Sequence, residues 1–194
     1  MERDDFLDLI FRQARSHSVW QARRVEDSLL RTLYEVASLG ATSSNSCPLR
    51  LVFVCSDEGR KTLLPCLSEG NVAKTESAPV TMIFAYDILF YERMAVVSSS
   101  GAKFASRYQA DEKQAEQAAH FNASLQAAYC MIVARALGLD CGPMGGFSRA
   151  KIDAAFLQGS SWRSFLLCNL GYGDGTSLRP RGERPPFDEA CRVV

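Results

Sequence analysis

The sequence predicts one domain of alternating helices and short strands, an α/β or α+β fold with a small sheet. The chain has 194 residues, of which 47% are apolar, which is enough for one hydrophobic core. Segments with apolar residues at helical spacing alternate with short runs of β-branched and aromatic residues. We therefore expect residues 1–194 to form a single domain.

Two amphipathic helices are expected at the N-terminal end. Apolar residues recur at helical spacing from Phe6 to Ala14 and again from Leu29 to Ala37. Gly40 follows the second pattern, in the position of a C-terminal helix cap. The loop GATSSNSCPLR, residues 40–50, then separates the helices from the first strand.

Three apolar runs predict strands, at residues 51–55, 79–86 and 164–173. A short helix over residues 58–67 is expected between the first two strands. Two further helical patterns precede the third strand, from residue 111 to residue 137 and from residue 149 to residue 157. The first of these is polar at its start and then apolar nearly all round, as expected of a helix that ends in the centre of the fold.

The C-terminal segment, residues 175–194, is expected to be an extended arm. It contains the Pro-rich stretch RPRGERPPFDEACRVV, which lacks an obvious core of its own. Such an arm often packs on a partner subunit.

Composition excludes several classes of partner. Lys plus Arg and Asp plus Glu both number 22, so no overall field attracts nucleic acid or an anionic membrane. The apolar run from Leu125 to Leu137 is too short to cross a bilayer, which takes about 20 residues.

The N-terminus lacks the apolar segment of a secretory signal, and the seven cysteines form no C-x-x-C pair. We expect a cytoplasmic protein with reduced, mostly buried thiols.

No side chain is assigned as a catalytic acid, base or nucleophile. Only His17 and His120 are available as a base for a serine nucleophile, and no G-x-S-x-G elbow is present. A thiol pair of Cys47 and His17 is an alternative, but nothing in the sequence places the two side chains together. Two isolated histidines without clustered cysteine or acidic ligands also argue against a metal site.

Two glycine-rich segments have different implications. GYGDGTS, residues 171–177, lacks the third glycine of a dinucleotide fingerprint and the lysine of a P-loop, so it predicts a turn. GLDCGPMGGF, residues 138–147, follows a helix and so is no Rossmann turn. Its glycines and Pro143 nevertheless allow the backbone to approach a ligand closely.

The remaining polar candidates are individually weak. Asn71 and Lys74 lie one helical turn apart, so an amide and a cation face the same space, although such pairs are more often solvated surface. Arg15, Arg181 and Arg184 are, taken alone, ordinary surface charges. Together these side chains form an inventory for a planar, phosphorylated, hydrogen-bonding cofactor.

In their order along the chain, the segments from Arg15 to Val194 resemble the FMN-dependent nitroreductase family. Arg15 and Ser16 match the start of its opening motif, and Ser18 stands where a second basic residue is usual. In GATSSNSCPLR, Asn45 matches the asparagine of the family's flavin platform loop. The pair of Asn71 and Lys74, the segment GPMGGF and the segment RPPFDE resemble the family's pyrimidine, central-ring and phosphate contacts.

This resemblance implies an α+β nitroreductase-like fold, with a small mixed or antiparallel sheet flanked by helices and a C-terminal arm exchanged in a homodimer. It implies that FMN takes a hydride from NADH or NADPH and passes electrons to a small-molecule acceptor in ping-pong fashion. The implied acceptor is a nitro or quinone compound or, because RSHSVW, NSCP and FDEAC resemble the malonic semialdehyde reductases, malonic semialdehyde. The alternative is a flavin-binding or sensing protein without efficient turnover on the same fold.

The resemblance also implies the cofactor-binding residues. The ring side of the site comprises Ser43, Asn45, Asn71, Lys74, Pro143, Gly145 and Gly146. The phosphate side comprises Arg15, Ser16, Ser18, Arg181 and Arg184. The chemistry is assigned to FMN, with Lys74 and Asn71 stabilising the charge of the reduced ring.

Overall fold

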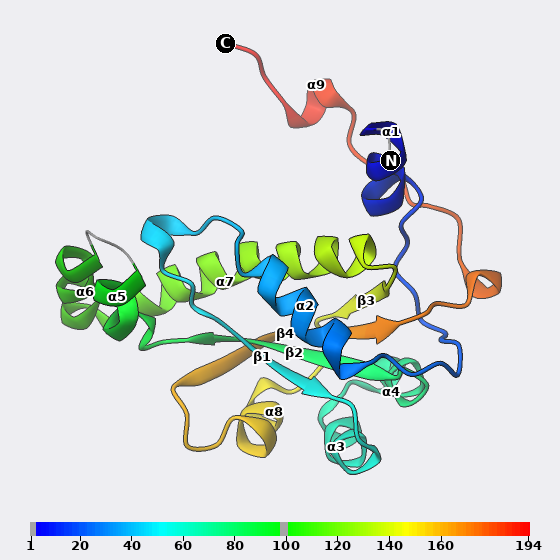
Figure 1. Ribbon diagram of the computed structural model, residues 1–194, viewed down its shortest axis with the longest axis horizontal. Coiled ribbons are helices and arrows are strands. Elements are labelled where there is room, and N and C mark those ends of the chain that lie inside the picture. The colour runs from blue at the N-terminus through cyan, green and yellow to red at the C-terminus, as the bar shows by residue number, and fades with distance from the viewer. Residues whose placement is uncertain (1–2, 98–100) are drawn as a thin grey trace.

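A four-stranded antiparallel sheet forms the centre of the protein in the computed structural model, which describes residues 3–97 and 101–194 (Figure 1). The strand order is β1-β2-β4-β3, and every neighbouring pair is antiparallel. The strands are β1 (Leu49–Val54), β2 (Val80–Asp87), β3 (Asp140–Met144) and β4 (Trp162–Gly171). The predicted α+β class is confirmed, and the sheet is antiparallel rather than mixed.

Helices cover both faces of this sheet. The first face carries α2 (Asp27–Ala37) and α7 (Glu112–Ala136), and the second carries α3 (Asp57–Leu63) and α8 (Arg149–Phe156) (Figure 1). Each face has its own cluster of buried apolar side chains. All eight residues of β2 are buried because this strand has neighbours on both edges and helices on both faces.

The face of α7 that packs on the sheet consists largely of alanine, which lets the helix approach the strands closely. Two polar side chains interrupt this face, and both hold the loop before β1. The Oδ1 atom of Asn122 accepts a hydrogen bond from the Ser43 amide at 2.8 Å. The Oε1 atom of Gln126 accepts one from the Leu49 amide at 3.0 Å. The loop is therefore anchored to the central helix at both of its ends.

The predicted role of Gly40 as a helix cap is wrong. Helix α2 ends at Ala37 with right-handed Ser38 as its cap, and Gly40 has no left-handed φ angle. Instead, a Cβ atom at Gly40 would lie 2.1 Å from Cδ2 of Tyr129. The Tyr129 hydroxyl, on α7, also donates to the Ala41 carbonyl at 3.1 Å. Gly40 is therefore required by the close approach of the chain to an aromatic ring.

Residues 138–147 were expected to form a glycine-rich loop, but their centre is the edge strand β3. Pro143 lies within this strand, where its missing N–H is tolerated because β3 has a neighbour on one edge only. Gly142 allows a second close approach, because a Cβ atom there would lie 2.4 Å from the His17 carbonyl oxygen. The proline and the glycines concealed the strand from the sequence pattern.

Several short elements complete the fold. The expected N-terminal helix is α1 (Arg3–Leu7) followed by a π-helical segment, Asp8–Arg12. The sequence pattern did not identify the segment η4 (Phe90–Arg93), α5 (Met94–Val97) or α6 (Gly101–Ala110). The other short elements are Ser43–Asn45, Leu64–Cys66, α4 (Glu69–Glu76) and Gly175–Ser177.

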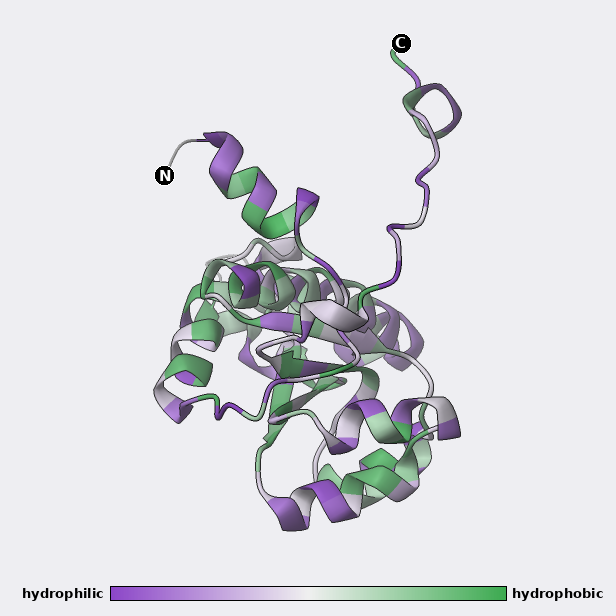
Figure 2. Ribbon diagram, turned by 90° about the vertical axis from the view of Figure 1, so that its right-hand side faces the viewer, coloured by the Kyte–Doolittle hydropathy of each residue, from purple (hydrophilic) through white to green (hydrophobic). Residues whose placement is uncertain are grey.

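The two ends of the chain project from the same side of the body (Figure 2). Residues 181–194 are exposed throughout and contain one short helix, α9 (Phe187–Ala190). Apolar side chains lie unburied on both segments, including Phe11 at 52% exposure and Phe187 at 62%. Within the described residues, no helix has both the length and the apolarity that crossing a bilayer requires.

All seven cysteines are free thiols, and four of them are buried. Burial raises the pKa of the Cys130 thiol to about 12. A thiol with so high a pKa stays protonated and unreactive at neutral pH. The burial of four of the seven agrees with the expectation that most of the cysteines are buried.

Gly40→Ala is expected to lower the free energy of unfolding by about 1 to 3 kcal/mol, because the new methyl group displaces the Tyr129 ring. Gly70→Ala in α4 is the matched control, since nothing lies within 4 Å of a Cβ atom there. Alanine favours the helix, so the control keeps or gains stability. Urea denaturation followed by circular dichroism measures both, and equal stabilities would contradict the Gly40–Tyr129 contact.

Candidate functional site

The segment from Arg15 to Ser18 is fixed on β3. Ser16 forms a bridge with Cys141, and the His17 amide donates to the Cys141 carbonyl at 3.0 Å. The absence of a side chain at Gly142 makes this contact possible. The segment and the edge strand therefore present their side chains to a common space.

Helix α4 is fixed against the same space through the backbone of Lys74. The Lys74 carbonyl accepts from Trp20 Nε1 and from Asn169 Nδ2, each at 3.1 Å. Asn71 Nδ2 donates to the Gly146 carbonyl at 2.9 Å, and Asn71 Oδ1 lies 3.5 Å from Lys74 Nζ. These bonds fix the backbone of Lys74, and its exposed ammonium group lies beside Asn71 near the end of the helix.

A polar pocket of about 290 Å³ lies where these segments meet. It is lined by Arg15, Ser16, His17, Ser18, Asn71, Lys74, Gly142, Pro143, Met144, Asn169, Ser177, Leu178 and Arg179. The predicted residues from the opening motif, from α4 and from β3 are therefore brought together. Gly146 adjoins this polar pocket, because its carbonyl accepts the hydrogen bond from Asn71. Gly145 lies between Gly146 and the last residue of β3, Met144.

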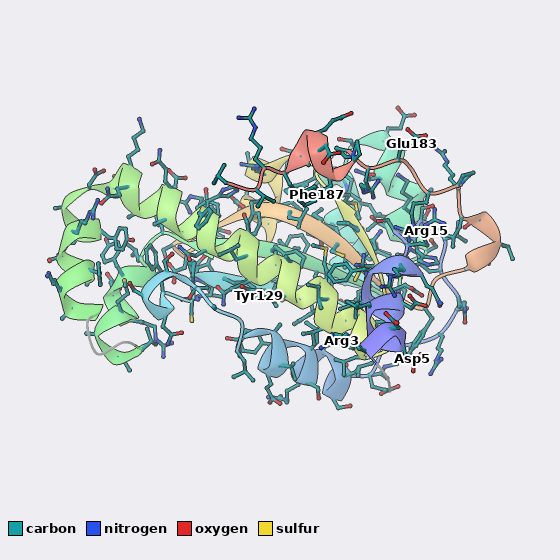
Figure 3. The ribbon with its side chains drawn as sticks, turned by 90° about the horizontal axis from the view of Figure 1, so that it is seen from above. Arg3, Asp5, Arg15, Tyr129, Glu183 and Phe187 are labelled. Carbon is teal, nitrogen blue, oxygen red and sulfur yellow. The ribbon has the colours of Figure 1, made fainter. Side chains whose placement is uncertain are left out.

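A second pocket, of about 460 Å³, shares Arg15 and Ser16 with the first. Four arginines line this arginine pocket, and no acidic residue does. They are Arg15, Arg135, Arg181 and Arg184. Figure 3 shows Arg15 beside the N-terminal helix, at the end of the molecule from which the arm departs. A local positive field therefore exists in a chain whose net charge is zero.

Carbonyl groups rather than carboxylates hold these guanidinium groups. Arg181 Nη2 donates to the carbonyls of Arg12 and Ala14, each at 2.7 Å, and Arg15 Nη2 donates to the Arg179 carbonyl. Arg135 Nη1 donates to the Ile10 carbonyl at 2.9 Å, whereas its Nε atom is buried and has no hydrogen-bond partner within residues 3–97 and 101–194. These hydrogen bonds position the positive charges, and no carboxylate of the described part of the chain forms an ion pair with the four arginines.

His17 is buried beneath the polar pocket. Its Nε2 atom lies 3.4 Å from Asp140 Oδ1, and Asp140 Oδ2 accepts from the Gly173 amide at 2.9 Å. Cys47 lines a different pocket, so the structure does not assemble the thiol pair considered from the sequence. The contacts of His17 tie the opening segment to β3 and to the turn after β4.

The loop that contains Ser43 and Asn45 lies elsewhere. It packs against α7 near α5, whereas α4 and β3 lie at the opposite end of α7 (Figure 1). Asn45 Nδ2 donates to the Val97 carbonyl at 2.7 Å, and neither Asn45 nor Ser43 lines the polar or the arginine pocket. A single chain therefore does not bring this loop to the other predicted residues.

Comparison with known proteins identifies the family. The model of the nitroreductase family matches residues 11–172. The chain belongs to the nitroreductase family. The resemblance inferred from the ordered motifs is therefore confirmed.

Two such relatives carry the name "Putative NADH dehydrogenase/NAD(P)H nitroreductase". The one from Ralstonia nicotianae is 47% identical over 188 residues, covering 97% of this chain and 96% of the relative. The one from Stutzerimonas stutzeri is 51% identical over 185 residues, covering 95% and 94%.

Solved structures of other nitroreductases share the fold. A nitroreductase family protein from Streptococcus pneumoniae superposes with a TM-score of 0.85 at 22% identity, covering 97% of this chain and 100% of that one. A "putative nitroreductase in complex with FMN" from Exiguobacterium sibiricum gives 0.85 at 19% identity, covering 98% and 97%. At these identities the superpositions establish the architecture.

In this nitroreductase-family chain, sequence reasoning missed two side chains that shape the pockets. Asn169 interrupts the apolar run of β4. Its buried side-chain amide donates a hydrogen bond to the Lys74 carbonyl and accepts one from the Thr81 hydroxyl. A polar residue inside a buried strand was the available signal. Arg135 faces the arginine pocket from the end of α7, and a basic residue in a mostly apolar helix was the corresponding signal.

Proposed function

We propose that this protein is an FMN-dependent NAD(P)H oxidoreductase that transfers a hydride to a small acceptor. The observation that carries the proposal is the junction of two unlike pockets at Arg15. One offers the amide of Asn71 and the ammonium of Lys74, and the other offers four guanidinium groups. FMN has the same division, with a planar hydrogen-bonding ring at one end and a phosphate at the other.

The donor set fits this cofactor. Arg135 Nε is buried without a hydrogen-bond partner among the described residues, as expected of a donor that a phosphate oxygen satisfies. A Cβ atom at Gly146 would lie 2.7 Å from Asn71 Nδ2, so only glycine leaves the Asn71 amide in place. The volume of the arginine pocket, about 460 Å³, lies within the range of cofactor sites, roughly 300 to 1,000 Å³, and that of the adjoining polar pocket, about 290 Å³, lies just below it.

When bound, FMN supplies the hydride chemistry and gains negative charge on reduction. In our proposal the Lys74 ammonium stabilises that charge, because the bonds to its own carbonyl and the contact with Asn71 fix its position beforehand. Arg15, Arg181 and Arg184 hold the phosphate, together with Arg135. Ser16 lines both pockets, and Ser18 lines the polar pocket.

A homodimer belongs to the same proposal. Phe121 on α7 is 60% exposed, and both projecting ends of the chain carry unburied apolar side chains. The outer edge of β1 is unpaired beside an apolar hollow of about 620 Å³. A second copy covers such surfaces, exchanges the C-terminal arm, and brings its own Ser43 and Asn45 to the cofactor.

The proposed acceptor is malonic semialdehyde, which reduction converts to 3-hydroxypropionate, or a nitro or quinone compound. The names of the relatives support NAD(P)H and a nitro compound, and the FMN complex of the Exiguobacterium structure supports the cofactor. Anaerobic mixing with NADH or NADPH, followed by addition of each acceptor, tests the proposal. Repeated turnover indicates an enzyme, and a flavin that is retained without turnover indicates the flavin-storage or sensing alternative.

The protein is expected to purify with FMN and to melt at a higher temperature when FMN is added. Ligand at about 100 times its dissociation constant stabilises the folded state by roughly 2.7 kcal/mol. Absorbance spectroscopy and thermal denaturation measure the two effects. A colourless protein whose melting temperature does not change when FMN is added would overturn the proposal.

Lys74→Ala should slow cofactor reduction by about tenfold to a hundredfold while weakening FMN binding less. A charge-assisted hydrogen bond that strengthens as charge develops acts on the rate. Arg184→Ala should have the reverse effect, since a phosphate contact is the same before and after reduction. Stopped-flow reduction and FMN titration measure both variants, and equal effects on both quantities would show that at least one residue is misplaced.

The protein should sediment as a dimer with twice the 21.4 kDa mass of one chain. Deleting residues 185–194 should weaken both assembly and FMN retention, because these residues are exposed in the single chain. Analytical ultracentrifugation of both proteins checks this expectation. A full-length monomer that retains FMN is the contrary result.

A further inference from the structure

A smaller pocket, of about 170 Å³, lies between α2, the loop before β1 and the segment η4–α5. Its lining includes Tyr34, Ser46, Cys47, Arg50, Phe90 and Arg93. It shares no residue with the polar pocket or the arginine pocket. Its volume is below the range of cofactor sites, about 300 to 1,000 Å³, so it suits a ligand of a few heavy atoms.

The charge of this small pocket is positive. Two arginines line it, and no acidic residue does. Arg50 is paired with Asp87, whose Oδ2 atom lies 2.7 Å from Arg50 Nη2. Arg93 has no ion-pair or hydrogen-bond partner among residues 3–97 and 101–194. The net positive charge therefore comes from Arg93, beside a second guanidinium group that Asp87 holds in place.

Ser46 supplies an independent indication of a ligand. Its side chain is 4% exposed, and its Oγ atom has no hydrogen-bond partner among the described residues. A buried hydroxyl without a partner is unfavourable, and folded proteins nearly always satisfy such groups. Because Ser46 lines the small pocket, a ligand there can provide the missing partner.

We infer that the small pocket binds a short carboxylate. A carboxylate accepts hydrogen bonds from guanidinium and hydroxyl groups at the same time. Phe90, which is 1% exposed, and Val97 form an apolar wall that suits a short carbon chain. Inorganic phosphate has no group to place against that wall, so the lining favours an organic acid.

This inference deepens the proposed function and rests on it in one respect. Ser46 and Cys47 directly follow Asn45, in the loop that a second copy is proposed to bring to the cofactor. The small pocket then lies beside the reaction centre and holds the carboxylate end of an acidic acceptor. The alternative ligand is a separate carboxylate compound, which binds in the small pocket but is not the acceptor and is not reduced.

Titration of the full-length protein with malonate tests the site, with malonamide and inorganic phosphate as comparison ligands. Malonate should bind, and the other two should not. Arg93→Ala should weaken malonate binding by about tenfold to a hundredfold, the contribution of a charge-assisted hydrogen bond. Arg107→Ala is the matched control, because this exposed arginine on α6 bonds Gln114 and lines none of the pockets described above.

Ser46→Ala separates ligand binding from folding. It should weaken malonate binding yet leave the unfolding temperature of the free protein unchanged or higher, because it removes a buried hydroxyl without a partner. Malonate affinity that is unchanged in both Arg93→Ala and Ser46→Ala overturns the site. Preferential binding of phosphate overturns the assignment to a carboxylate.

Steady-state kinetics distinguish the two sources of the carboxylate. If it belongs to the acceptor, Arg93→Ala raises KM for malonic semialdehyde about tenfold or more and leaves turnover with neutral p-benzoquinone unchanged. If it is a free carboxylate, malonate binding is lost but both KM values stay the same. A protein without any NAD(P)H turnover contradicts the proposed function, and the malonate titration still decides the site.

Discussion

The close packing of α7 on the sheet is the constraint on which the rest of the structure depends. Alanines on its inner face let the helix lie near the strands, and the buried amides of Asn122 and Gln126 fix the loop before β1. Tyr129 then leaves room only for glycine at position 40. At the other end of the same helix, Arg135 completes the arginine pocket. One helix therefore sets the distance between the arginine pocket and the loop before β1.

The sequence was informative where apolar spacing was regular. The patterns of α2, α7, β1, β2 and β4 were identified within a few residues of their observed bounds. Strand β3 was missed because Gly142 and Pro143 are rare in strands, and only its place at the sheet edge tolerates the proline. Gly40 was misinterpreted because a helix cap and a close contact both call for glycine, and only tertiary structure distinguishes them.

The candidate site was predictable only through the order of its motifs. Each arginine, amide and glycine is unremarkable alone, and spacing along the chain does not show convergence in space. The structure brings Arg15, Ser18, Asn71 and Lys74 to one pocket. It leaves Ser43 and Asn45 at the far end of α7, and their role stays a prediction about assembly. Arg135 and Asn169 stand out in the sequence as polar residues within apolar runs, but only the tertiary structure shows which groups they contact.

Arg181 joins the two ends of the chain, because its guanidinium group donates to carbonyls of the first helical segment and of Ala14. A residue that is translated late therefore bonds to residues that are translated early. During synthesis the helices and the first two strands can form early, since domains begin to fold from the N-terminal side. The arginine pocket is complete only after Arg181 and Arg184 have been translated, so a chain cut short before them lacks two of its four guanidinium groups.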